Sequence, residues 1–507
     1  MTTGSALALA GVLVIVALTL VVGAIGLRVS RTTSDFYVAS RTVGPGVNAA
    51  AISGEYLSAA SFLGVAGLIL VRGIDMVWYP VGWTAGYLLL LLFVAAPLRR
   101  SRAYTLPDFA EFRLESSAAR GVSSALVVMI AVLYLIPQFR GAGLTLHLVT
   151  GAPSWLGSAL VAVVVLLGVA AGGMRSITLG QAVQYWVKLA ALLTPLVFLL
   201  ISAHGGSTRV WHRIDDTAWL EPLSGDHALY LTYSLIVATF LGTMGLPHVV
   251  VRFYTNRDGA AARRTTVNVL ALLSLFYLLP PAYGVLGRRL LGGSADPDSA
   301  LLSLPDRAFG GMGADLLTAV LASGAFAAFL STSSGLVLSL TGVLSQDVVS
   351  RGSHRLGPVA SFRVAAVGGA LVTLVLTWLT ANLAVAHAVE LAFAVSASTF
   401  APLLILGIWW RGLTSVGAIA GLVVGGLASG VAVVAAMAGY APTGLSGAVL
   451  AQPASLTVPL TFLVMVGVSL VTPRSLPPHV VRTMVRLHMP ESVAVDRSGF
   501  RTRVPED

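Results

Sequence analysis

Apolar stretches recur along almost the whole chain, and only short polar segments separate them. A helix of about 20 apolar residues is long enough to cross the roughly 30 Å hydrocarbon core of a bilayer. None of the intervening segments is long enough to fold as a soluble domain. The pattern therefore predicts an all-α polytopic membrane protein with about thirteen transmembrane helices. We expect these helices at residues 5–27, 46–70, 75–98, 121–149, 154–172, 178–204, 227–247, 264–291, 311–346, 358–381, 385–408, 413–437 and 455–472.

Composition supports this fold class and narrows the chemistry. Of the 507 residues, 56% are hydrophobic and only 10% are charged, whereas soluble domains carry roughly 25% charged residues. With so few charges, most of the surface must face lipid. The chain has no cysteine, which excludes disulfides, thiol catalysis and cysteine-bound metals. No basic residue precedes the first apolar stretch, so we expect an uncleaved helix there rather than a secretory signal.

The distribution of basic residues predicts the orientation, because cytoplasmic loops hold an excess of Lys and Arg. If the N-terminus lies outside, 23 basic residues fall on the inner side and six on the outer side. The six outer ones are Arg72, Arg209, Arg213, Arg288, Arg289 and Arg307. The outer loops instead carry the acidic residues Asp215, Asp216, Glu221, Asp226, Asp296 and Asp298. We therefore expect a multi-pass protein of the bacterial inner membrane, with its N-terminus outside and its C-terminus in the cytoplasm.

This orientation also accounts for the net charge of +10. Basic residues on the inner side attract anionic lipid, so the expected partner is the lipid bilayer and no nucleic acid. The segment 473–507 is polar and contains five prolines. We expect it to be a short cytoplasmic tail without a catalytic domain.

The segment 48–64 is unusually polar for a membrane helix, since it contains Asn48, Ser53, Glu55, Tyr56 and two further serines. A carboxylate inside the membrane needs a partner or water. The Ser-Gly-Glu sequence favours an unwound stretch, whose backbone carbonyls could bind a cation. The alternative is an ordinary packing helix of small residues with Glu55 near an interface.

A second interruption is expected in the segment 239–255, where Gly242, Gly245 and Pro247 fall within six residues. Matching interruptions in two halves of a chain are typical of the binding site of a transporter. His248 could titrate during a transport cycle, but it lies beside the cytoplasmic arginines, where a histidine is more often a hydrogen-bonded structural residue.

A run of hydroxyl side chains in the segment 322–346 includes Ser331 and Thr332. Together with carbonyls of an unwound neighbour, these hydroxyls could form a small oxygen cage for Na⁺. The alternative is that they bond back to carbonyls one turn earlier in their own helix.

Gln181, Gln184, Tyr185 and Lys188 share one helix face, because they are spaced at i, i+3, i+4 and i+7. A lysine inside a membrane helix must face water, a carboxylate or carbonyls. The buried carboxylates available to it are those of Glu55 and Glu390. Arg140 is a second cation inside an expected helix, and either cation could be a structural partner of a carboxylate.

Six segments occur in order along the chain: 34–41, 54–64, 104–108, 245–253, the helix 324–347 that closes on Ser345-Gln346-Asp347, and 407–412. As an ordered set they resemble the sodium:solute symporter family, and most closely its acetate or monocarboxylate permease branch. The resemblance spans roughly residues 30–415. It implies the leucine-transporter type of fold, with two inverted five-helix repeats.

This resemblance also implies a division of the chain and a sodium site. The expected parts are a leading helix and loop (1–45), two repeats (46–204 and 205–408), two trailing helices (409–472) and the tail (473–507). The coupling ion Na⁺ would bind between the first broken helix and the helix that carries the hydroxyl run. Its expected ligands are the carbonyls of Ala49, Ile52 and Ala328 and the hydroxyls of Ser331 and Thr332.

Two positions depart from related branches. Ala51 stands where proline symporters carry an aspartate, and Gln181 stands where sugar symporters carry one, which argues against both substrates. By the same resemblance, Arg140 and Lys188 are candidates to neutralise a carboxylate solute. The expected substrate-binding residues are Ser53, Glu55, Tyr56, Tyr134, Gln138, Thr239 and Thr243.

The sequence thus predicts a secondary active symporter that couples Na⁺ entry to uptake of acetate, propionate, pyruvate or a similar monocarboxylate. It is not expected to be an enzyme, to bind an organic cofactor or to need a protein partner, and it has no Walker-type motif for ATP. One alternative keeps the fold but uses protons or another solute, with Glu55 or His248 as the titrating group. Another is a solute-sensing membrane module, for which the tail is short.

Overall fold

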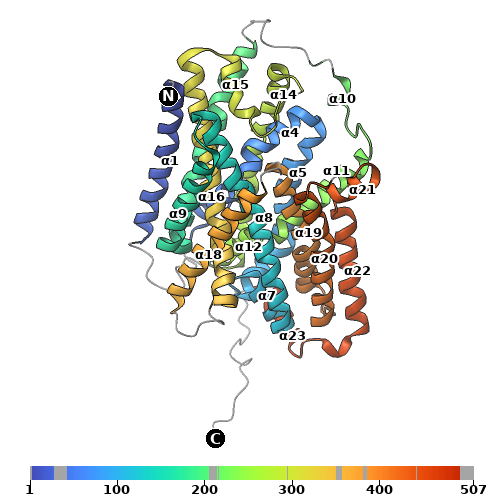
Figure 1. Cartoon of the computed structure of the whole chain (residues 1–507). Coiled ribbons are helices and arrows are strands. Elements are labelled where there is room, and N and C mark those ends of the chain that lie inside the picture. The colour runs from blue at the N-terminus through green and yellow to red at the C-terminus, as the bar shows by residue number, and fades with distance from the viewer. Residues whose placement is uncertain are drawn as a thin grey trace.

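The computed structural model describes residues 3–27, 43–204, 214, 216–293, 295–349, 357–380, 385–440 and 442–490. Every regular element in these residues is a helix, and the helices pack side by side into one bundle (Figure 1). Some expectations concern other parts of the chain: the motif at 34–41, the loop residues Arg209, Arg213 and Asp215, and the tail beyond residue 490 lie outside the described residues. The helices are α1 (Thr3–Leu27), α3 (Pro45–Tyr56), α4 (Val65–Arg72), α5 (Trp78–Leu89), α6 (Ala95–Ser101), α7 (Leu106–Leu114), α8 (Ser117–Thr150), α9 (Ser154–His204), α10 (Thr217–Leu220), α11 (Ala228–Gly245), α12 (Pro247–Val251), α13 (Gly259–Tyr277), α14 (Leu279–Leu291), α15 (Ala300–Ala308), α16 (Gly311–Leu344), α18 (Pro358–Leu379), α19 (Val385–Trp409), α20 (Ser415–Met437), α21 (Gly444–Ala451), α22 (Ala454–Val471) and α23 (Val480–His488).

The expected membrane helices are present. Within the described residues, eleven helices are long and apolar enough to cross a bilayer. A twelfth crossing is the pair Pro45–Tyr56 and Ala60–Arg72, which are bent by 71° at the break between them. The remaining expected helix, 154–172, corresponds to Ser154–Ala170, a shorter apolar helix.

Helix α9 contains one of the candidate spans, Ser176–His204, and the shorter apolar helix Ser154–Ala170. Its 51 residues would measure about 75 Å as one straight helix, far more than the hydrocarbon core of a bilayer. Near its start, Ser158 donates a hydrogen bond to the Phe139 carbonyl in α8 (2.7 Å). Near its middle, Ser176 donates to the Gly23 carbonyl, close to the end of α1 (3.2 Å).

The positions of the two ends of the chain indicate whether the number of membrane crossings is even or odd. Figure 1 places the start of α1 at one end of the bundle and α23 at the opposite end. Twelve crossings would return the chain to the face on which it started, so an odd number is needed. The shorter apolar helix Ser154–Ala170 is the candidate for such a thirteenth crossing, which stays a prediction.

The first helix break differs in position from the expectation. The sequence Ser53-Gly54-Glu55 was expected to unwind, but α3 continues through Tyr56 and the helix breaks at Leu57 and Ser58. Gly54 has a different role, because a Cβ atom there would collide with the Gln181 carbonyl of α9. It permits close packing of α3 on α9 rather than unwinding.

The second break lies where the glycines and the proline predict it. Helix α11 ends at Gly245, Leu246 is extended, and Pro247 opens α12 at the first helical position, where its missing N–H costs no hydrogen bond. The two breaks are joined by a hydrogen bond of 2.7 Å between the Tyr56 and Thr243 hydroxyls.

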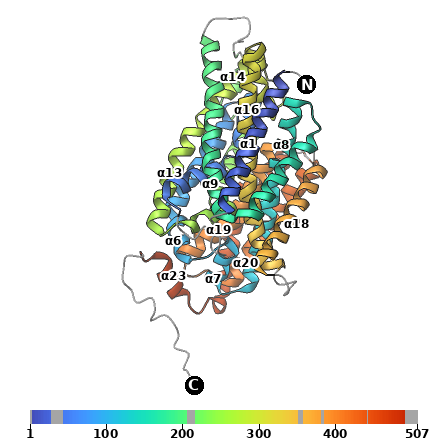
Figure 2. The same cartoon turned by 90° about the vertical axis from the view of Figure 1, so that its left-hand side faces the viewer.

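Helix α16 runs through the interior and packs against α9, α1, α8 and α3. Figure 2 shows α1 and α9 in front of it. On the other side of the bundle, α20 and α22 pack against each other and against α19 (Figure 1). The interior of the bundle is thus formed by α3, α8, α9, α11, α16 and α19.

Candidate functional site

The break in the first core helix is held open by side chains from distant helices. Gln138 of α8 accepts a hydrogen bond from the Ala59 backbone N–H, which follows the break (2.9 Å). On the other side of the break, the Ser53 carbonyl still accepts from the Leu57 N–H (3.1 Å), but the carbonyls after it have no i+4 partner within the helix. Side chains from α9 and α16 donate to three of them, the carbonyls of Gly54, Glu55 and Leu57.

The main partner of these carbonyls is Lys188 of α9. Its ammonium donates to the carbonyls of Gly54 and Leu57, the latter at 2.7 Å, and to the Ser331 hydroxyl of α16 at 2.6 Å. The side chain is completely buried. Lys188 therefore forms hydrogen bonds to neither of the carboxylates, Glu55 and Glu390, that the sequence offered as its partners.

The hydroxyl run contacts the same carbonyls. Ser331 lies 2.9 Å from the Gly54 carbonyl and 3.0 Å from the Ala328 carbonyl. Thr332 donates to the Glu55 carbonyl at 2.6 Å. The structure thus brings Ala328, Ser331 and Thr332 together at the break.

The backbone oxygens opposite these hydroxyls are not the two that the sequence indicated. Ala49 and Ile52 are buried within α3, four or more residues before its end, where a carbonyl accepts the regular i+4 hydrogen bond. The carbonyls freed by the break are those of Gly54, Glu55 and Leu57, about one turn later. This difference follows from the later position of the break.

A charged pair crosses the interior next to this oxygen cluster. Arg252, which follows α12, donates to the Glu55 carboxylate at 2.5 Å. It also donates to Gln181 and, at 2.8 Å, to Thr178 of α9. Both side chains of the ion pair are at most 2% exposed. The requirement that an intramembrane carboxylate be paired is therefore met by an arginine that the sequence assigned to an inner loop.

Aromatic rings form a cluster around Phe393 of α19. Its ring lies 5.7 Å from that of Trp83, 5.9 Å from that of Tyr134 and 6.3 Å from that of Tyr56, measured between centroids. Tyr87 packs on Tyr56 at 4.9 Å. We refer to Tyr56, Trp83, Tyr87, Tyr134, His248 and Phe393 as the aromatic cluster; all six side chains are buried.

Several polar atoms of the aromatic cluster are unpaired. The Trp83 indole nitrogen, the Tyr87 hydroxyl and both ring nitrogens of His248 form no hydrogen bond with the described residues. The His248 ring lies 5.2 Å from that of Tyr134. Buried polar groups without partners are rare in folded proteins, and they are found where a ligand or water completes them.

The other expected substrate residues occupy varied positions. Gln138 and Tyr134 lie on α8 beside the break. Thr243 contacts Tyr56, as described above, and Thr239 bonds back to the Leu235 carbonyl in its own helix (2.8 Å). Ser53 is buried in α3, and its hydroxyl has no partner among the described residues.

The two remaining charge candidates lie apart from the oxygen cluster. Glu390 on α19 faces His387 at 3.5 Å. Arg140 interacts electrostatically with Asp298, which precedes α15 and accepts a hydrogen bond from the Val385 backbone at 3.2 Å. Burial raises the pKa of the Asp298 carboxyl above its ordinary value.

Comparison with known proteins identifies the family. A model of the sodium:solute symporter family matches residues 36–425. The monocarboxylic acid transporter of Corynebacterium glutamicum is 32% identical over 450 residues, which cover 82% of this chain and 80% of that protein. The chain belongs to the sodium:solute symporter family. Membership means that this symporter is a transporter rather than an enzyme, and that it couples solute transport to sodium. YwcA, an uncharacterized symporter of Bacillus subtilis, is 31% identical to it over 475 residues, covering 89% of this chain and 91% of that protein.

Solved structures confirm the fold of the symporter. A Na⁺-coupled sialic acid symporter in a substrate-bound outward-open state aligns with a TM-score of 0.74 at 14% identity, covering 92% of this chain and 98% of the other. Mhp1, a nucleobase-cation-symport-1 family transporter, aligns with a TM-score of 0.56 at 15% identity, covering 90% and 99%. MhsT in complex with L-phenylalanine also aligns, with a TM-score of 0.56 at 14% identity and coverage of 83% and 98%. These similarities confirm the leucine-transporter type of fold.

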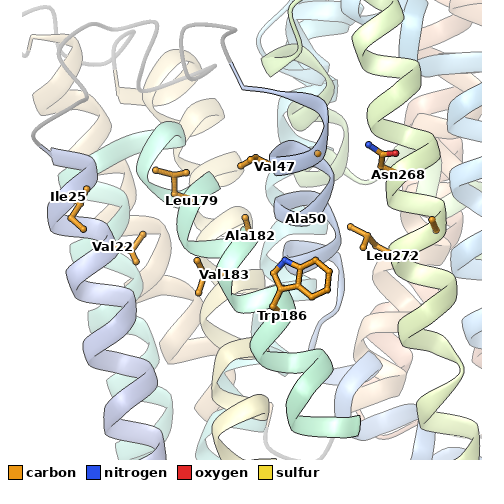
Figure 3. A pocket seen from close by; sticks show the side chains of 12 residues that line it. Val22, Ile25, Val47, Ala50, Leu179, Ala182, Val183, Trp186, Asn268 and Leu272 are labelled. Carbon is orange, nitrogen blue, oxygen red and sulfur yellow. The ribbon is translucent and has the colours of Figure 1, made fainter. Parts of the chain in front are cut away.

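A large groove of the symporter lies outside this site. It has a volume of about 770 Å³ and is formed by α1, α3, α9 and α13 (Figure 3). Apart from Trp186 and Asn268, its lining is aliphatic. Trp186, Val183 and Leu179 are all more than 40% exposed and lie on the side of α9 that faces away from Lys188. An exposed apolar groove of a membrane helix bundle is suited to lipid rather than to a charged solute.

Sequence reasoning missed several members of the site. Arg252 was counted as an inner-loop residue, and Trp83, Tyr87 and Phe393 were not considered. One available signal was the Gly82-Trp83 and Gly86-Tyr87 repeat at i and i+4. Glycines at this spacing let α5 approach α11, because Cβ atoms at Gly82 and Gly86 would collide with or crowd Thr239 and Thr243. The adjacent aromatic residues then face the interior.

Proposed function

We propose that the symporter couples Na⁺ entry to uptake of a small monocarboxylate of the acetate, propionate or pyruvate type. The observation that carries the substrate class is the set of unpaired groups in the aromatic cluster. The indole N–H of Trp83 and the hydroxyl of Tyr87 are donors, and the His248 ring supplies at least one more. A carboxylate is an acceptor with about four lone-pair sites, and the surrounding rings suit a short apolar chain. The name of the Corynebacterium glutamicum relative supports the same class.

The proposed sodium site is the oxygen cluster at the break, formed by the carbonyls of Gly54 and Leu57, the carbonyl of Ala328 and the hydroxyls of Ser331 and Thr332. Uncharged oxygen ligands of this kind suit a hard cation. Its position beside Glu55 and the aromatic cluster places ion and solute next to each other. Ion binding would then favour the arrangement of the break that binds the carboxylate.

The division into parts at 1–45, 46–204, 205–408, 409–472 and 473–507 belongs to the same proposal. In it, the two broken helices α3/α4 and α11/α12 open the two repeats. Alternating access moves one set of helices against the other around the breaks.

The experiment is uptake of radiolabelled acetate, propionate and pyruvate into proteoliposomes under an imposed Na⁺ gradient or an imposed pH gradient. Ser331→Ala/Thr332→Ala should abolish Na⁺-driven uptake, because it removes both side-chain ligands. Ser334→Ala is the matched control. Its hydroxyl lies in the same helix but bonds back to the Leu330 carbonyl (2.7 Å), so uptake should persist.

The other possible results of the uptake experiment each test a different part of the proposal. Uptake driven only by the pH gradient and unaffected by the double substitution would discard the sodium site in favour of proton coupling through Glu55 or His248. No uptake of any of the three monocarboxylates under either gradient would reject the substrate class. A loss of uptake equal in the Ser334→Ala control would mean that α16 had been disturbed as a whole.

A further inference from the structure

Lys188, the one lysine of the chain, occupies the position proposed for the coupling ion. Its ammonium has three N–H donors, and three oxygens accept them: the Gly54 carbonyl, the Leu57 carbonyl at 2.7 Å and the Ser331 hydroxyl at 2.6 Å. The hydrogen-bonding capacity of the ammonium is thus filled. No part of the side chain is exposed.

This ammonium is not held by a counter-ion. The nearby Glu55 carboxylate is in an ion pair with Arg252, and Lys188 has no salt bridge to it. The negative ends of dipoles hold the cation instead, namely backbone carbonyls at the C-terminal end of α3 and one hydroxyl. Such a set of oxygens is a cation site by its chemistry, and Lys188 fills it from α9.

We propose that Lys188 is a tethered competitor of the coupling ion. Its ammonium and Na⁺ exclude each other from the oxygens of Gly54, Leu57 and Ser331, and sodium binds there only after the Lys188 side chain has moved out. This inference rests on the proposed location of the sodium site.

The physical basis is the sharing of ligands and of space. Two cations at one small oxygen cluster would repel each other strongly at the low dielectric of the interior, and each needs the same lone pairs. The stem of lysine has four flexible carbons, so its ammonium can leave without a backbone change. The Glu55 carboxylate interacts electrostatically with Lys188 and attracts the ammonium once it is displaced.

Competition has a consequence for the empty transporter. Without sodium, the ammonium links α3, α9 and α16 across the break and stabilises this arrangement. With sodium, the ion takes over these contacts. The observed sodium affinity then contains the cost of displacing Lys188.

The experiment measures binding of radioactive sodium to the purified full-length protein in detergent. Lys188→Ala removes the tethered cation and leaves space, and it should tighten sodium binding at least about ten-fold. Adding Ser331→Ala to Lys188→Ala should cancel this gain, because it removes a shared ligand. Gln184→Ala is the matched control: Gln184 lies one turn earlier on the same face of α9 but donates to Thr19 of α1 (2.9 Å), so sodium affinity should not change.

Sodium binding no tighter in Lys188→Ala than in the wild type would overturn the competition. A gain that persists after Ser331→Ala would also overturn it, because the sodium would then be bound elsewhere. Failure of the proposed function is a separate result: Ser331→Ala in the wild-type background would leave sodium binding and Na⁺-driven uptake unchanged.

Thermal unfolding gives a second measurement should Lys188→Ala be poorly stable. A ligand that binds only the folded state raises Tm with its concentration. NaCl should therefore raise the Tm of Lys188→Ala well above its value in choline chloride, and should raise that of the wild type much less. Added methylammonium, which replaces the missing cation, should weaken the sodium effect in Lys188→Ala. Equal sodium-dependent shifts in the two proteins would contradict the competition.

Discussion

At the scale of single residues, the interior is organised by three buried ionisable groups. Glu55 and Arg252 form an ion pair, and Lys188 is held by carbonyls and a hydroxyl. The sequence correctly indicated that Glu55 and Lys188 need partners, because a charge in the membrane interior must be compensated. The sequence could not indicate which residues these partners are. The partner of Glu55 is Arg252, which the break after Gly245 carries back into the interior.

The Glu55–Arg252 pair leads to a prediction about stability. Arg252→Met leaves the Glu55 carboxylate buried without a counter-ion, and breaking a buried pair in this way costs about 3–5 kcal/mol. We expect a clearly lower Tm in detergent. Replacing both partners, as Glu55→Leu/Arg252→Met, should recover most of the loss, because an apolar pair has no charge to compensate.

Comparison of the single and double substitutions separates charge from packing. If the double substitution were as unstable as Arg252→Met, the lost contacts of Arg252 with Thr178 and Gln181 would be the cause rather than the unpaired carboxylate. Uptake assays are a poor readout here, since Glu55 lies next to the proposed binding site.

At the scale of elements, the breaks and caps of the helices determine where backbone groups become available. The second break was predictable, because Gly245 and Pro247 act locally. The first break was predicted at Ser53-Gly54-Glu55, before its actual position at Leu57 and Ser58. The sequence does not reveal that Gly54 is needed for packing on α9. The actual break depends on Gln138 and Lys188, which lie more than 70 residues away in the sequence.

The end of α19 illustrates a cap supplied from a distant element. Arg113 of α7 donates to the Gly407 carbonyl at 2.7 Å and to the Trp410 carbonyl at 2.9 Å. Burial lowers the pKa of Arg113 to about 10, so the guanidinium stays charged at neutral pH. A cation at a helix C-terminus also interacts favourably with the helix dipole.

We therefore expect Arg113→Ala to destabilise the protein. Each buried carbonyl that loses its partner costs about 1–3 kcal/mol, and a fall in Tm in detergent should report the loss. Because α19 carries Phe393 of the aromatic cluster, monocarboxylate uptake should decrease as well. Arg474→Ala, at an exposed position in the segment after α22, removes the same charge without removing a cap. An equal effect of both substitutions would attribute the loss to net charge rather than to the cap.

At the scale of the whole molecule, most of the crossings were predictable because they depend on composition alone. Thirteen apolar stretches were expected. Within the described residues, eleven helices and one bent pair are candidate spans, and the stretch 154–172 corresponds to a shorter apolar helix. The arrangement of these helices around the interior was not derivable from periodicity, since a helix buried on most sides has no clear polar face. It followed from the resemblance to a family, and the similarity to solved structures confirms it. The orientation in the membrane stays a prediction from the arginine distribution.

The absence of cysteine from the chain makes this orientation directly measurable. A single introduced cysteine is the one thiol that a membrane-impermeant maleimide can label. Ser446→Cys lies at an exposed position of α21, and Val481→Cys lies on α23, where Val481 is 59% exposed. The two helices lie at opposite ends of α22, which separates them along the chain (Figure 1). With the N-terminus outside, Ser446→Cys should be labelled in intact cells of an expression host stripped of its outer membrane, and Val481→Cys only after permeabilisation.

The reverse labelling pattern would invert the orientation while leaving the fold unchanged, and the excess of arginine would then lie on the outer face. Labelling of both positions in intact cells would contradict a membrane crossing by α22, because α21 and α23 would share a face. The parent protein without cysteine is the background control, and it should remain unlabelled under both conditions. Since loops rich in arginine are retained in the cytoplasm during insertion, we expect the first pattern, with α23 and the helices α6 and α7 that it packs against on the cytoplasmic side.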